Sequence, residues 1–526
     1  MFRSATLAAS STGVFQLIRR KLAFITSFAP MSTALPEKSI DIDVIVPVYN
    51  AVATLRECVE SALLQVGLDE EDVRRFRVYV CCYDDGSSDH SWKLLNQLLK
   101  EHAARQQDAS AALENATGQP YLRTTLLIGK AEDGVSRGAG YARNRAVHLR
   151  NVEDTDSASR QASTRLLAML DSDDVMMPTR LVTQARFWCS LPDSQIRNST
   201  LIGCQFKRDP PESTWHYTQW ANSLTDERLS LEKFREVTLL QPTWMMSRSW
   251  FTRLGGYLEA PAPDQTNFSM DDFAIALLGQ HDDSKNLLEL VDESNDTAQT
   301  LRVAEDTRFF YKHLSAGGSL RLLRANEPLL MYRHREGQSQ SSQTPRKLLF
   351  SLRVRAFEQM VLEKESSSWS KFCIWGAGRD GKDFIKALRP EFRKRVFCMV
   401  DVDEKKISAG YYCHKKWGLR VPIVHFSMLA RYDSVRDQLR TSFESGADMH
   451  EPGFGRIRKG RDSAQEEREK ERPRKRRKAS HVELDKNVLP TLPVVVCVAM
   501  YRTGGALEHN VQSIGRTEGV DLWHFS

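Results

Sequence analysis

Short apolar runs alternate with amphipathic segments in the first third of the chain. Two runs, Ile42 to Val48 and Arg77 to Cys82, have the composition of buried strands. Apolar residues recur with helical spacing in the segments that follow, from Thr54, a predicted cap, to Leu64 and from Trp92 to Leu99. A further run, Leu166 to Leu170, is again a strand. This alternation predicts an α/β fold with a mainly parallel sheet, which binds ligands at the carboxyl ends of its strands.

The same alternation returns near the C-terminus. A break in composition at 337–345 precedes a helical pattern that ends near Glu365, and a new strand begins at Lys371. The runs expected to form strands in this part are 371–375, 396–401, 493–500 and 521–525. A second, smaller Rossmann-like α/β domain is therefore predicted.

The expected organisation has four parts. They are a disordered or targeting extension over 1–40, an α/β domain over 41–345, a helical linker over 346–370 and a Rossmann-like domain over 371–526. Polar or charged segments interrupt both domains and are expected to be surface insertions. They cover about 106–118, 151–164, 259–300 and 433–486.

Composition narrows the class of protein and its compartment. Of 526 residues, 41% are hydrophobic and 27% are charged, which excludes a wholly disordered, collagen-like or coiled-coil chain. The nine cysteines form no C-x-x-C pair, so a zinc ribbon and a disulfide scaffold are disfavoured and a reducing, cytoplasmic location is expected. Two other locations stay possible alternatives to the cytoplasm. The acid-free N-terminal extension is compatible with mitochondrial import, and the basic run 472–478 with nuclear import. No apolar run is long enough to span a membrane.

Acidic residues directly follow two of the predicted strands. Asp84 and Asp85 end one strand, where carboxylates can hold the base and ribose of a nucleotide; a simple turn is the alternative. Asp171 and Asp173 end another, and two carboxylates on alternate residues favour a hard divalent cation that carries diphosphate oxygens. A solvated, helix-capping loop is the alternative there. Because neither acid has a basic neighbour in the sequence, nucleotide binding is expected to require the cation.

A third acidic pair, Glu305-Asp306, precedes an amphipathic helical pattern, where acids are also common as caps. The three acidic elements occur in the order and rough spacing of the family 2 glycosyltransferases with the A-type fold, which this chain resembles. The motifs that carry the resemblance are Pro47 to Asn50, Asp84 to Asp89, Gly140 to Asn144, Leu170 to Asp174 and Tyr332 to His334. The resemblance implies a Rossmann-like A-type domain and an inverting, metal-dependent transfer of a hexose from a UDP-sugar to a hydroxyl.

The resemblance also implies roles for individual residues. Asp306 is the implied catalytic base, which deprotonates the acceptor. Asp173, together with Asp171, is the implied ligand of Mg²⁺ or Mn²⁺, which stabilises the departing UDP as a Lewis acid. Asp85 is expected to contact uracil or ribose, and Arg143 to neutralise phosphate. The implied nucleotide-sugar-binding residues are Pro47, Tyr49, Asp85, Arg143, Asp171 and His334, where a packed, structural histidine is the alternative for His334.

Further segments resemble a narrower group within this family, the queuosine-tRNA galactosyltransferases. They are 303–313, 372–378, 398–406, 422–426 and 517–526. This narrower resemblance implies UDP-galactose as donor and a queuosine hydroxyl in tRNA as acceptor, whereas an older description of the group implies UDP-N-acetylglucosamine. The alternatives are therefore N-acetylglucosamine transfer to a glycan or protein, and a non-catalytic nucleotide-sugar- or RNA-binding module that kept the fold.

The distribution of charge bears on the tRNA partner. The net charge of +6 is concentrated in residues 1–36 and 456–478, so the rest of the chain is net negative. Binding of tRNA is therefore expected to need a local cationic face. The candidates are Arg137, Arg143, Arg145 and Arg150 in the first domain and Arg389, Arg393, Lys394 and Arg395 in the second.

A glycine-rich loop marks the second domain. Gly376, Gly378 and Gly381 form a G-x-G-x-x-G pattern between a predicted strand and a predicted helix, and Asp401 ends the next strand. This context is that of a dinucleotide site. Because no hydride-transfer residues accompany the loop, the preferred interpretation is an accessory domain in which the glycines allow tight packing of helix on strand, with contact to acceptor RNA as an option.

Overall fold

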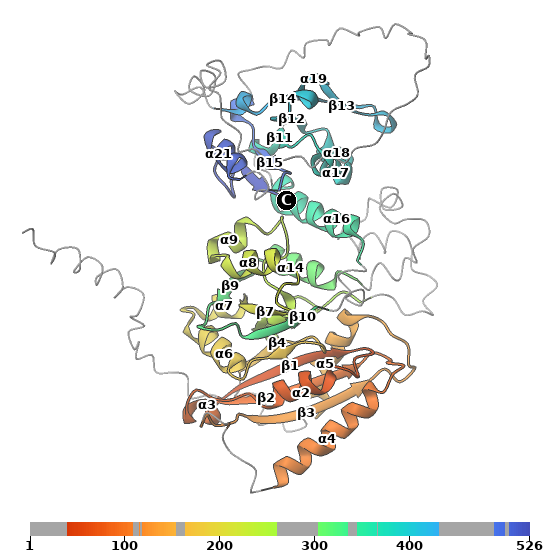
Figure 1. The fold of residues 1–526 in the computed structure, drawn as a ribbon, viewed down its shortest axis with the longest axis vertical. Coiled ribbons are helices and arrows are strands. Elements are labelled where there is room, and N and C mark those ends of the chain that lie inside the picture. The colour runs from red at the N-terminus through yellow and green to blue at the C-terminus, as the bar shows by residue number, and fades with distance from the viewer. Residues whose placement is uncertain are drawn as a thin grey trace, which may run out of the picture. The chain divides into compact units, whose positions relative to one another are not determined.

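In the computed structural model, strand β1 (Ile40–Val48) is buried along its whole length. It pairs in parallel with β2 (Phe76–Asp84) on one side and with β4 (Thr164–Met169) on the other. Its run of apolar, largely β-branched residues suits a strand that is covered on both faces. The prediction of parallel strands at these three places is confirmed (Figure 1).

The structure describes most of the chain after residue 38. The described residues are 39–108, 115, 118–153, 164–259, 303–334, 344–364, 367–430, 489–499 and 504–525. The predicted N-terminal extension up to residue 38, the larger part of the four insertions and the basic run 472–478 lie outside them. Among the described residues, no helix is both long and apolar enough to cross a membrane.

Further strands extend the first sheet on both sides. In the described part of the chain its order is β3-β2-β1-β4-β8-β6-β9. The added strands are β3 (Arg123–Lys130), β6 (Thr200–Cys204), β8 (Met245–Ser247) and β9 (Ser319–Leu323). Because β8 runs antiparallel to both of its neighbours, the sheet is mixed, although most of its strands are parallel.

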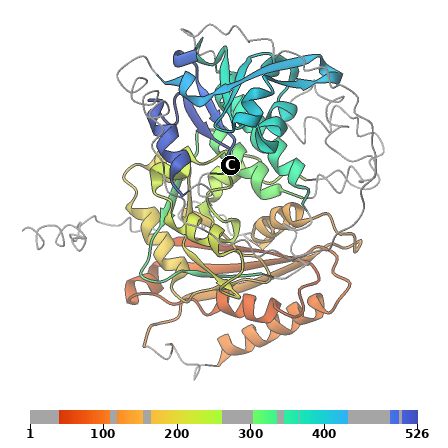
Figure 2. The ribbon, with the colours of Figure 1, turned by 45° about the horizontal axis from the view of Figure 1, so that its top comes forward.

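Helices cover both faces of this sheet. α2 (Leu55–Leu63) and α4 (Ser91–Gln107) lie on one face, and α5 (Ala139–Glu153) lies on the other (Figure 2). Alternate residues of β1 divide between the two faces, since Val44 packs in the cluster of α2 and Ile45 in the cluster of α5. The remaining helices up to residue 334 are α3 (Glu70–Arg75), α6 (Arg180–Ser190), α7 (Ser194–Asn198), α8 (Trp215–Ser223), α9 (Asp226–Leu231), α10 (Arg248–Arg253) and α14 (Glu305–Ser315).

The start of α2 differs from the prediction. Thr54 precedes the helix, but its side chain makes no capping hydrogen bond, so the predicted cap is wrong. The hydroxyl instead donates to the carbonyl oxygen of Ser172, 3.0 Å away, in the loop after β4. The start of α2 is thereby fastened to the loop that carries Asp171 and Asp173.

A small sheet begins directly after this loop. Its strands, among the described residues, are β5 (Val175–Met176), β10 (Leu330–Arg333) and β7 (Phe206–Asp209). β10 pairs with β5 in antiparallel and with β7 in parallel orientation. The register of β10 and β7 sets Tyr332 beside Arg208.

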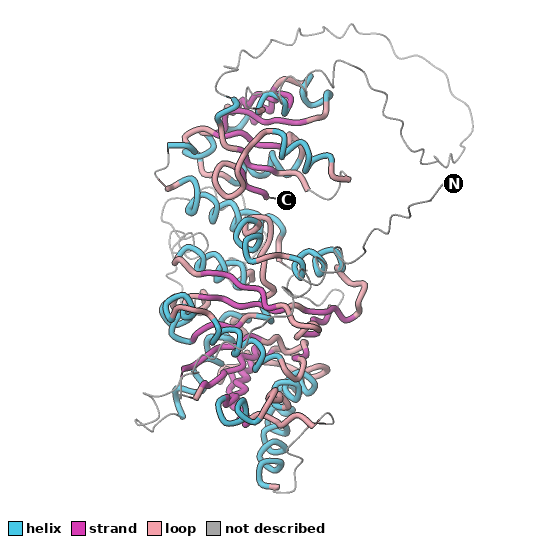
Figure 3. Tube along the Cα trace, turned by 90° about the vertical axis from the view of Figure 1, so that its left-hand side faces the viewer, coloured by secondary structure: helices cyan, strands magenta, loops and turns pink. Residues whose placement is uncertain are grey.

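The C-terminal part is a second α/β unit of alternating helices and strands (Figure 3). After α16 (Arg346–Phe357), its sheet has the order β13-β14-β12-β11-β15-β16 in the described residues. The strands are β11 (Phe372–Trp375), β12 (Val396–Asp401), β13 (Tyr411–His414), β14 (Leu419–His425), β15 (Val494–Val496) and β16 (Leu522–His524), and the helices are α17 (Arg379–Ala387), α18 (Pro390–Arg393), α19 (Glu404–Ser408) and α21 (Ala506–Ser513). The strands predicted in this part are confirmed.

Aromatic side chains from distant parts of the sequence share one core. Phe525 stacks on Phe234 with ring centroids 5.8 Å apart and meets Phe357 of α16 edge-on at 5.4 Å. All three rings are almost fully buried. Residues 39–526 accordingly cluster as one compact unit, and the domain boundaries at 345 and 370 stay predictions.

Candidate active site

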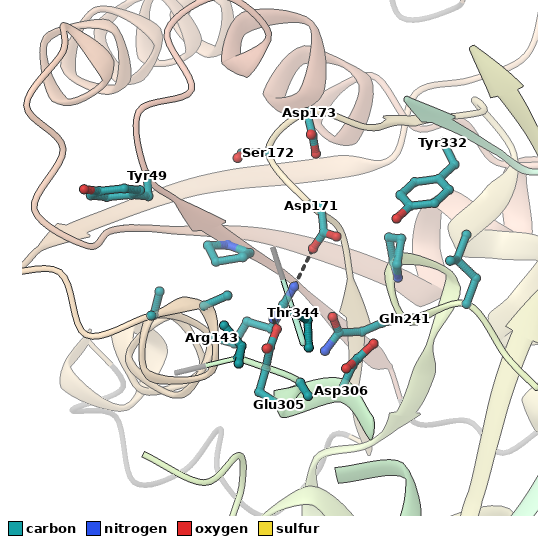
Figure 4. Close-up of a pocket in the computed structure, with 18 of the residues that line it drawn as sticks. Tyr49, Arg143, Asp171, Ser172, Asp173, Gln241, Glu305, Asp306, Tyr332 and Thr344 are labelled. Atoms are coloured by element: carbon teal, nitrogen blue, oxygen red, sulfur yellow. Dashed lines mark hydrogen bonds and ion pairs between the residues drawn. The ribbon is translucent and has the colours of Figure 1, made fainter. Parts of the chain in front are cut away.

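A cavity of about 970 Å³ opens at the carboxyl ends of β1, β2 and β4. Most of the predicted site residues line it, namely Pro47, Tyr49, Asp85, Arg143, Asp171, Asp173 and Asp306. Figure 4 shows Asp171 and Arg143 joined by an ion pair, with Glu305 and Asp306 close by. Residues that are up to 259 positions apart in the sequence therefore meet in one place.

Asp85 is held at the floor of the cavity by one of its two carboxylate oxygens. Oδ2 accepts hydrogen bonds from the hydroxyl of Ser136 (2.8 Å) and from the amides of Arg137 (2.8 Å) and Gly138 (2.7 Å). Oδ1 is buried and has no partner in the described residues. Burial raises the pKa of Asp85, and the three donors only partly oppose this effect. The side chain therefore presents one fixed acceptor oxygen.

Tyr49 lies at the mouth of the cavity, and about half of it is exposed. The next residue, Asn50, has a positive φ of 48° and fastens this loop to the loop after β2. Its amide donates to the hydroxyl of Ser87 (2.9 Å), and its side-chain oxygen accepts from the amide of Ser88 (2.8 Å). The exposed ring is thus carried by a loop with a defined position.

Arg143 joins two of the acidic elements. Its guanidinium donates to Asp171 at 2.5 Å and to Glu305 at 2.6 Å, and its side chain is only 3% exposed. Burial opposes the charge, but the two carboxylates outweigh it and raise the pKa of Arg143. Asp171 has no basic neighbour in the sequence, but the fold supplies a basic partner from α5, 28 residues away. Arg143 holds acids in place, and these contacts do not support its predicted role in neutralising phosphate.

The loop after β4 concentrates negative charge. Asp171 and Asp173 line the cavity, and Asp174 is fully buried with one oxygen that has no partner among the described residues. Burial, Asp171 and Asp173 raise the pKa of Asp174. The donors fit Mg²⁺ or Mn²⁺, which prefer oxygen ligands and take several of them from phosphate and water. No group of three metal-binding side chains occurs in the described residues, and Asp171 and Asp173 are the side chains that would hold the cation.

Glu305 and Asp306 open α14, after Ala304 in the left-handed region (φ 56°). Asp306 Oδ1 accepts hydrogen bonds from the amide and the hydroxyl of Thr307, at 2.6 and 3.2 Å. Its other oxygen has no partner in the part of the chain that is described. Burial and the neighbouring Glu305 raise the pKa of Asp306 to about 6. Asp306 is thus an anchored carboxyl group that exchanges its proton near neutral pH.

α14 is placed by close packing on α5. A Cβ atom added to Gly140 would lie 3.2 Å from the Cβ of Glu305 and 3.3 Å from the carbonyl oxygen of Leu258. Only a residue without a side chain fits there without displacing its neighbours. The glycine of the Gly140 to Asn144 motif therefore sets the distance between Arg143 and the acids of α14.

The remaining predicted site residue, His334, does not line the cavity. Its amide donates to the carbonyl oxygen of Asp209 (2.8 Å), which ends the pairing of β10 with β7. The cavity is lined instead by its two neighbours, Tyr332 and Arg333. A contact of His334 with the diphosphate stays a prediction that its position does not support.

Sequence reasoning missed several lining residues. They are Arg208, Tyr217, Glu236 and Gln241. None lies in a motif, and they come from β7, α8 and the loop before β8. The one available signal was Tyr332, a motif residue whose strand partner in the small sheet is Arg208.

The glycine-rich loop borders a second cavity of about 350 Å³, lined among others by Gly376 and Gly378. Gly381 lies in α17, where an added Cβ would fall 1.9 Å from the carbonyl oxygen of Gly376. Asp401 accepts the amide of Ala377 (2.8 Å) and the ammonium group of Lys406 (3.0 Å). The lack of side chains at Gly376 and Gly381 therefore allows the helix to pack closely on the strand. The carboxylate of Asp401 already accepts hydrogen bonds from groups of the protein itself.

Most of the arginines expected to form a cationic face for tRNA are neutralised. Arg137 pairs with Asp133, Arg145 with Glu259, and Arg150, which is buried, with Asp41 and Asp43. In the second part, Arg389 pairs with Glu358, and Arg393 is buried. These contacts do not support a cationic face built from these five arginines, whereas Lys394 is exposed and Arg395 is half-buried, and no ion pair of either with a described residue is seen.

Comparisons with known proteins agree with the motifs. The protein-family model described as Glycosyl transferase family 2 matches residues 43–113, a segment that contains Pro47, Tyr49 and Asp85. Among solved structures, the chain is similar to TarS of S. aureus, with 15% identity and a TM-score of 0.33 over 68% of this chain and 51% of that one. The chain thus spans about half the length of that structure.

Two further solved structures are similar. One is residues 1–349 of S. aureus TarS in complex with UDP-GlcNAc, with 14% identity and a TM-score of 0.34 over 68% of this chain and 84% of that one. The other is the mannosyltransferase PcManGT of Pyrobaculum calidifontis in complex with GDP-Man and Mn²⁺, with 15% identity and a TM-score of 0.34 over 66% and 72%. The matched family segment covers β1, β2 and the helices between and after them, so this part of the α/β fold is similar to glycosyltransferase family 2.

Proposed function

We propose that the protein is an inverting, metal-dependent glycosyltransferase that moves a hexose from a UDP-sugar to an acceptor hydroxyl. The observation that carries this proposal is the convergence of three acidic elements on one cavity at the edge of the family 2 domain. Each element offers a different chemistry. Asp85 has a fixed acceptor oxygen, the loop of Asp171 and Asp173 has oxygen ligands for a cation, and Asp306 has a carboxyl group with a pKa of about 6.

The donor base binds between Tyr49 and Asp85. The exposed ring of Tyr49 gives the base a surface on which to stack. The unpartnered Oδ1 of Asp85 accepts a hydrogen bond, and the imide N–H of uracil supplies one where cytosine has only an acceptor nitrogen. The site can therefore hold a uracil base.

The residues around the loop after β4 hold the ribose and the diphosphate. Arg143 fixes the orientation of Asp171 through an ion pair, and we expect the Asp171 carboxylate to contact the ribose. Asp173, with Asp171, would hold Mg²⁺ or Mn²⁺. When bound, such a cation lowers the energy of the negative charge that develops on the leaving diphosphate.

Asp306 acts as the general base. Its unpartnered oxygen takes the proton of the acceptor hydroxyl while that hydroxyl oxygen forms a bond to the anomeric carbon. The bond from the anomeric carbon to the diphosphate oxygen breaks in the same step, and its electron pair leaves with UDP. A single displacement of this kind inverts the configuration. Thr307 keeps the carboxyl group oriented through both of its bonds to Oδ1.

For the donor sugar and the acceptor we propose galactose and queuosine in tRNA, on the strength of the narrower resemblance. The second candidate is transfer of N-acetylglucosamine to a glycan or protein. A non-catalytic binding module is disfavoured by the free oxygen of Asp306, which a binding role does not require. A cytoplasmic location follows from the same proposal, since that is where the acceptor tRNA is found.

The test is an assay of the purified full-length protein with a panel of UDP-sugars and with total tRNA, read out by mass spectrometry of digested nucleosides. Galactose on queuosine supports the proposal, and tRNA from cells that lack queuosine is the matched control. Transfer only from UDP-N-acetylglucosamine favours the second candidate. Binding of UDP without transfer to any acceptor in the panel would identify a binding module.

A further inference from the structure

Arg208 differs from the other cationic residues that line the cavity. The lining cations are Arg143, Arg208 and Arg333. Arg143 is bonded to Asp171 and Glu305, and Arg333 pairs with Glu57 and Asp209. The side chain of Arg208 has no hydrogen bond or ion pair with any described residue, and its Nε is buried without a partner. It is the uncompensated positive charge of the described cavity wall.

Aromatic rings hold Arg208 in place instead of carboxylates. Its Cζ lies 4.1 Å from the centroid of the Tyr332 ring and 5.9 Å from that of Phe206. The Phe206 ring in turn contacts Tyr332 at 6.0 Å and Tyr217 at 6.2 Å. A guanidinium that lies on an aromatic ring keeps its N–H groups available for a planar, two-point contact with an anion. The aromatic rings therefore hold the Arg208 side chain without occupying its hydrogen-bond donors.

The position of Arg208 links it to the predicted cation site. Arg208 and Tyr332 are register partners in the small sheet, and the next residue, Arg333, donates from its amide to Asp174 (2.9 Å) and from its side chain to the carbonyl oxygen of Asp173 (3.2 Å). Burial, Asp174 and Asp171 raise the pKa of Tyr332, and the charge of Arg208 opposes them. Arg208 lines the same cavity as Asp171 and Asp173 and can therefore contact a ligand that is bound there.

The charges of the cavity determine which ligand needs this cation. Acidic side chains outnumber the three arginines in the lining; they are Asp85, Asp171, Asp173, Glu236, Glu305 and Asp306. A nucleotide diphosphate brings further negative charge to the same end of the cavity, and this charge grows on the leaving oxygen as the bond to the sugar breaks. We propose that Arg208 binds the diphosphate of the donor nucleotide and stabilises it as the leaving group. This inference rests on the proposed function.

The test is calorimetry of the full-length protein with uridine and with UDP, both in the presence of Mn²⁺. In Arg208→Gln the affinity for UDP is expected to fall by about 10- to 100-fold, the scale of a lost hydrogen bond to a charged group, while the affinity for uridine stays unchanged. For Arg208→Lys we expect an affinity for UDP between those of the wild type and Arg208→Gln. The ammonium group keeps the charge but loses the two-point contact. The matched control is Arg253→Gln, an exposed arginine that lies on the Trp250 ring at 5.2 Å and away from the cavity.

Each outcome decides a different question. If the wild-type protein does not prefer UDP to uridine, the proposed donor site is wrong. If it does and Arg208→Gln keeps the full preference, the role of Arg208 is overturned. A variant that binds UDP normally but has lost affinity for tRNA would assign Arg208 to an acceptor phosphate and would also overturn the proposal. Thermal unfolding verifies that each variant is folded, and if Arg208→Gln is not, the comparison of Arg208→Lys with wild type decides.

Discussion

Asp306 carries two separate properties, a fixed orientation and a free oxygen. Asp306→Asn keeps the size of the side chain and the bonds from Thr307 but removes the proton acceptor. We expect kcat to fall by at least about 100-fold, the usual scale for loss of a general base, with little change in the affinity for UDP. Steady-state rates and calorimetry measure the two quantities. Turnover close to the wild-type rate would mean that Glu305 or another acid is the base.

The raised pKa of Asp306 predicts the pH dependence of the rate. Burial and Glu305 raise this pKa to about 6, so the carboxyl group is protonated, and unable to act as base, at pH values where an ordinary aspartate is still ionised. We expect kcat at saturating donor to fall about tenfold per pH unit below 6 and to level off above it. A rate that stays constant from pH 5 to pH 8 would contradict this assignment.

Asp173 is expected to account for the dependence of UDP binding on a divalent cation. Asp171 and Asp173 line the cavity next to the buried Asp174, so a diphosphate would add negative charge where three acids already lie. Wild-type protein should bind UDP more weakly in EDTA than in Mn²⁺, and Asp173→Ala should remove this difference together with turnover. Calorimetry in the two buffers is the measurement. Equal affinities for the wild-type protein would show that the cation is not needed.

At the scale of elements, the contact between α5 and α14 sets the geometry of the acids. Gly140→Val would place a branched side chain where even a Cβ atom lies 3.2 Å from Glu305. We expect α14 to shift, stability to fall by about 1–3 kcal/mol, as for overpacked sites, and kcat to fall more than UDP affinity, because the donor base binds to other loops. Thermal unfolding, calorimetry and rates on the same preparation separate these effects. An unchanged kcat would show that Asp306 is not positioned by this contact.

The elements were predictable from the sequence, and many of their contacts were not. β1, β2, β4 and the C-terminal strands β11, β12, β15 and β16 were found because each contains an apolar run that is buried, whereas β13 and β14, which are partly exposed, were not predicted. The acids at their ends were found because parallel strands end at one edge. The bonds of Arg143 to Asp171 and Glu305 were missed because ion pairs across 28 and 162 residues depend on how helices pack. Arg208 was missed because an unpaired arginine has no pattern in a single sequence.

At the scale of the whole molecule, the two predicted domains depend on one another more than the sequence suggested. Phe234 comes shortly before residues that line the cavity, and it packs on Phe357 of α16 and on Phe525 after the last strand. Arg228 of α9 also pairs with Glu518. Single-sequence patterns identify each of these rings as a core residue but do not show that they belong to the same core.

This shared core predicts how the protein unfolds. Phe525 is almost fully buried and contacts Phe234, Phe357 and Phe384, with ring centroids 5.8, 5.4 and 4.7 Å away. Phe525→Ala is expected to cost about 3–5 kcal/mol, the range for removal of a buried phenyl ring. Because the ring joins both parts of residues 39–526, we expect calorimetry to show one transition at a lower temperature, with UDP stabilising the whole transition. Val520→Ala, at a site that is 65% exposed, is the control. Two separate transitions, with only the first stabilised by UDP, would show that the parts fold independently and that the shared core contributes little to the active site.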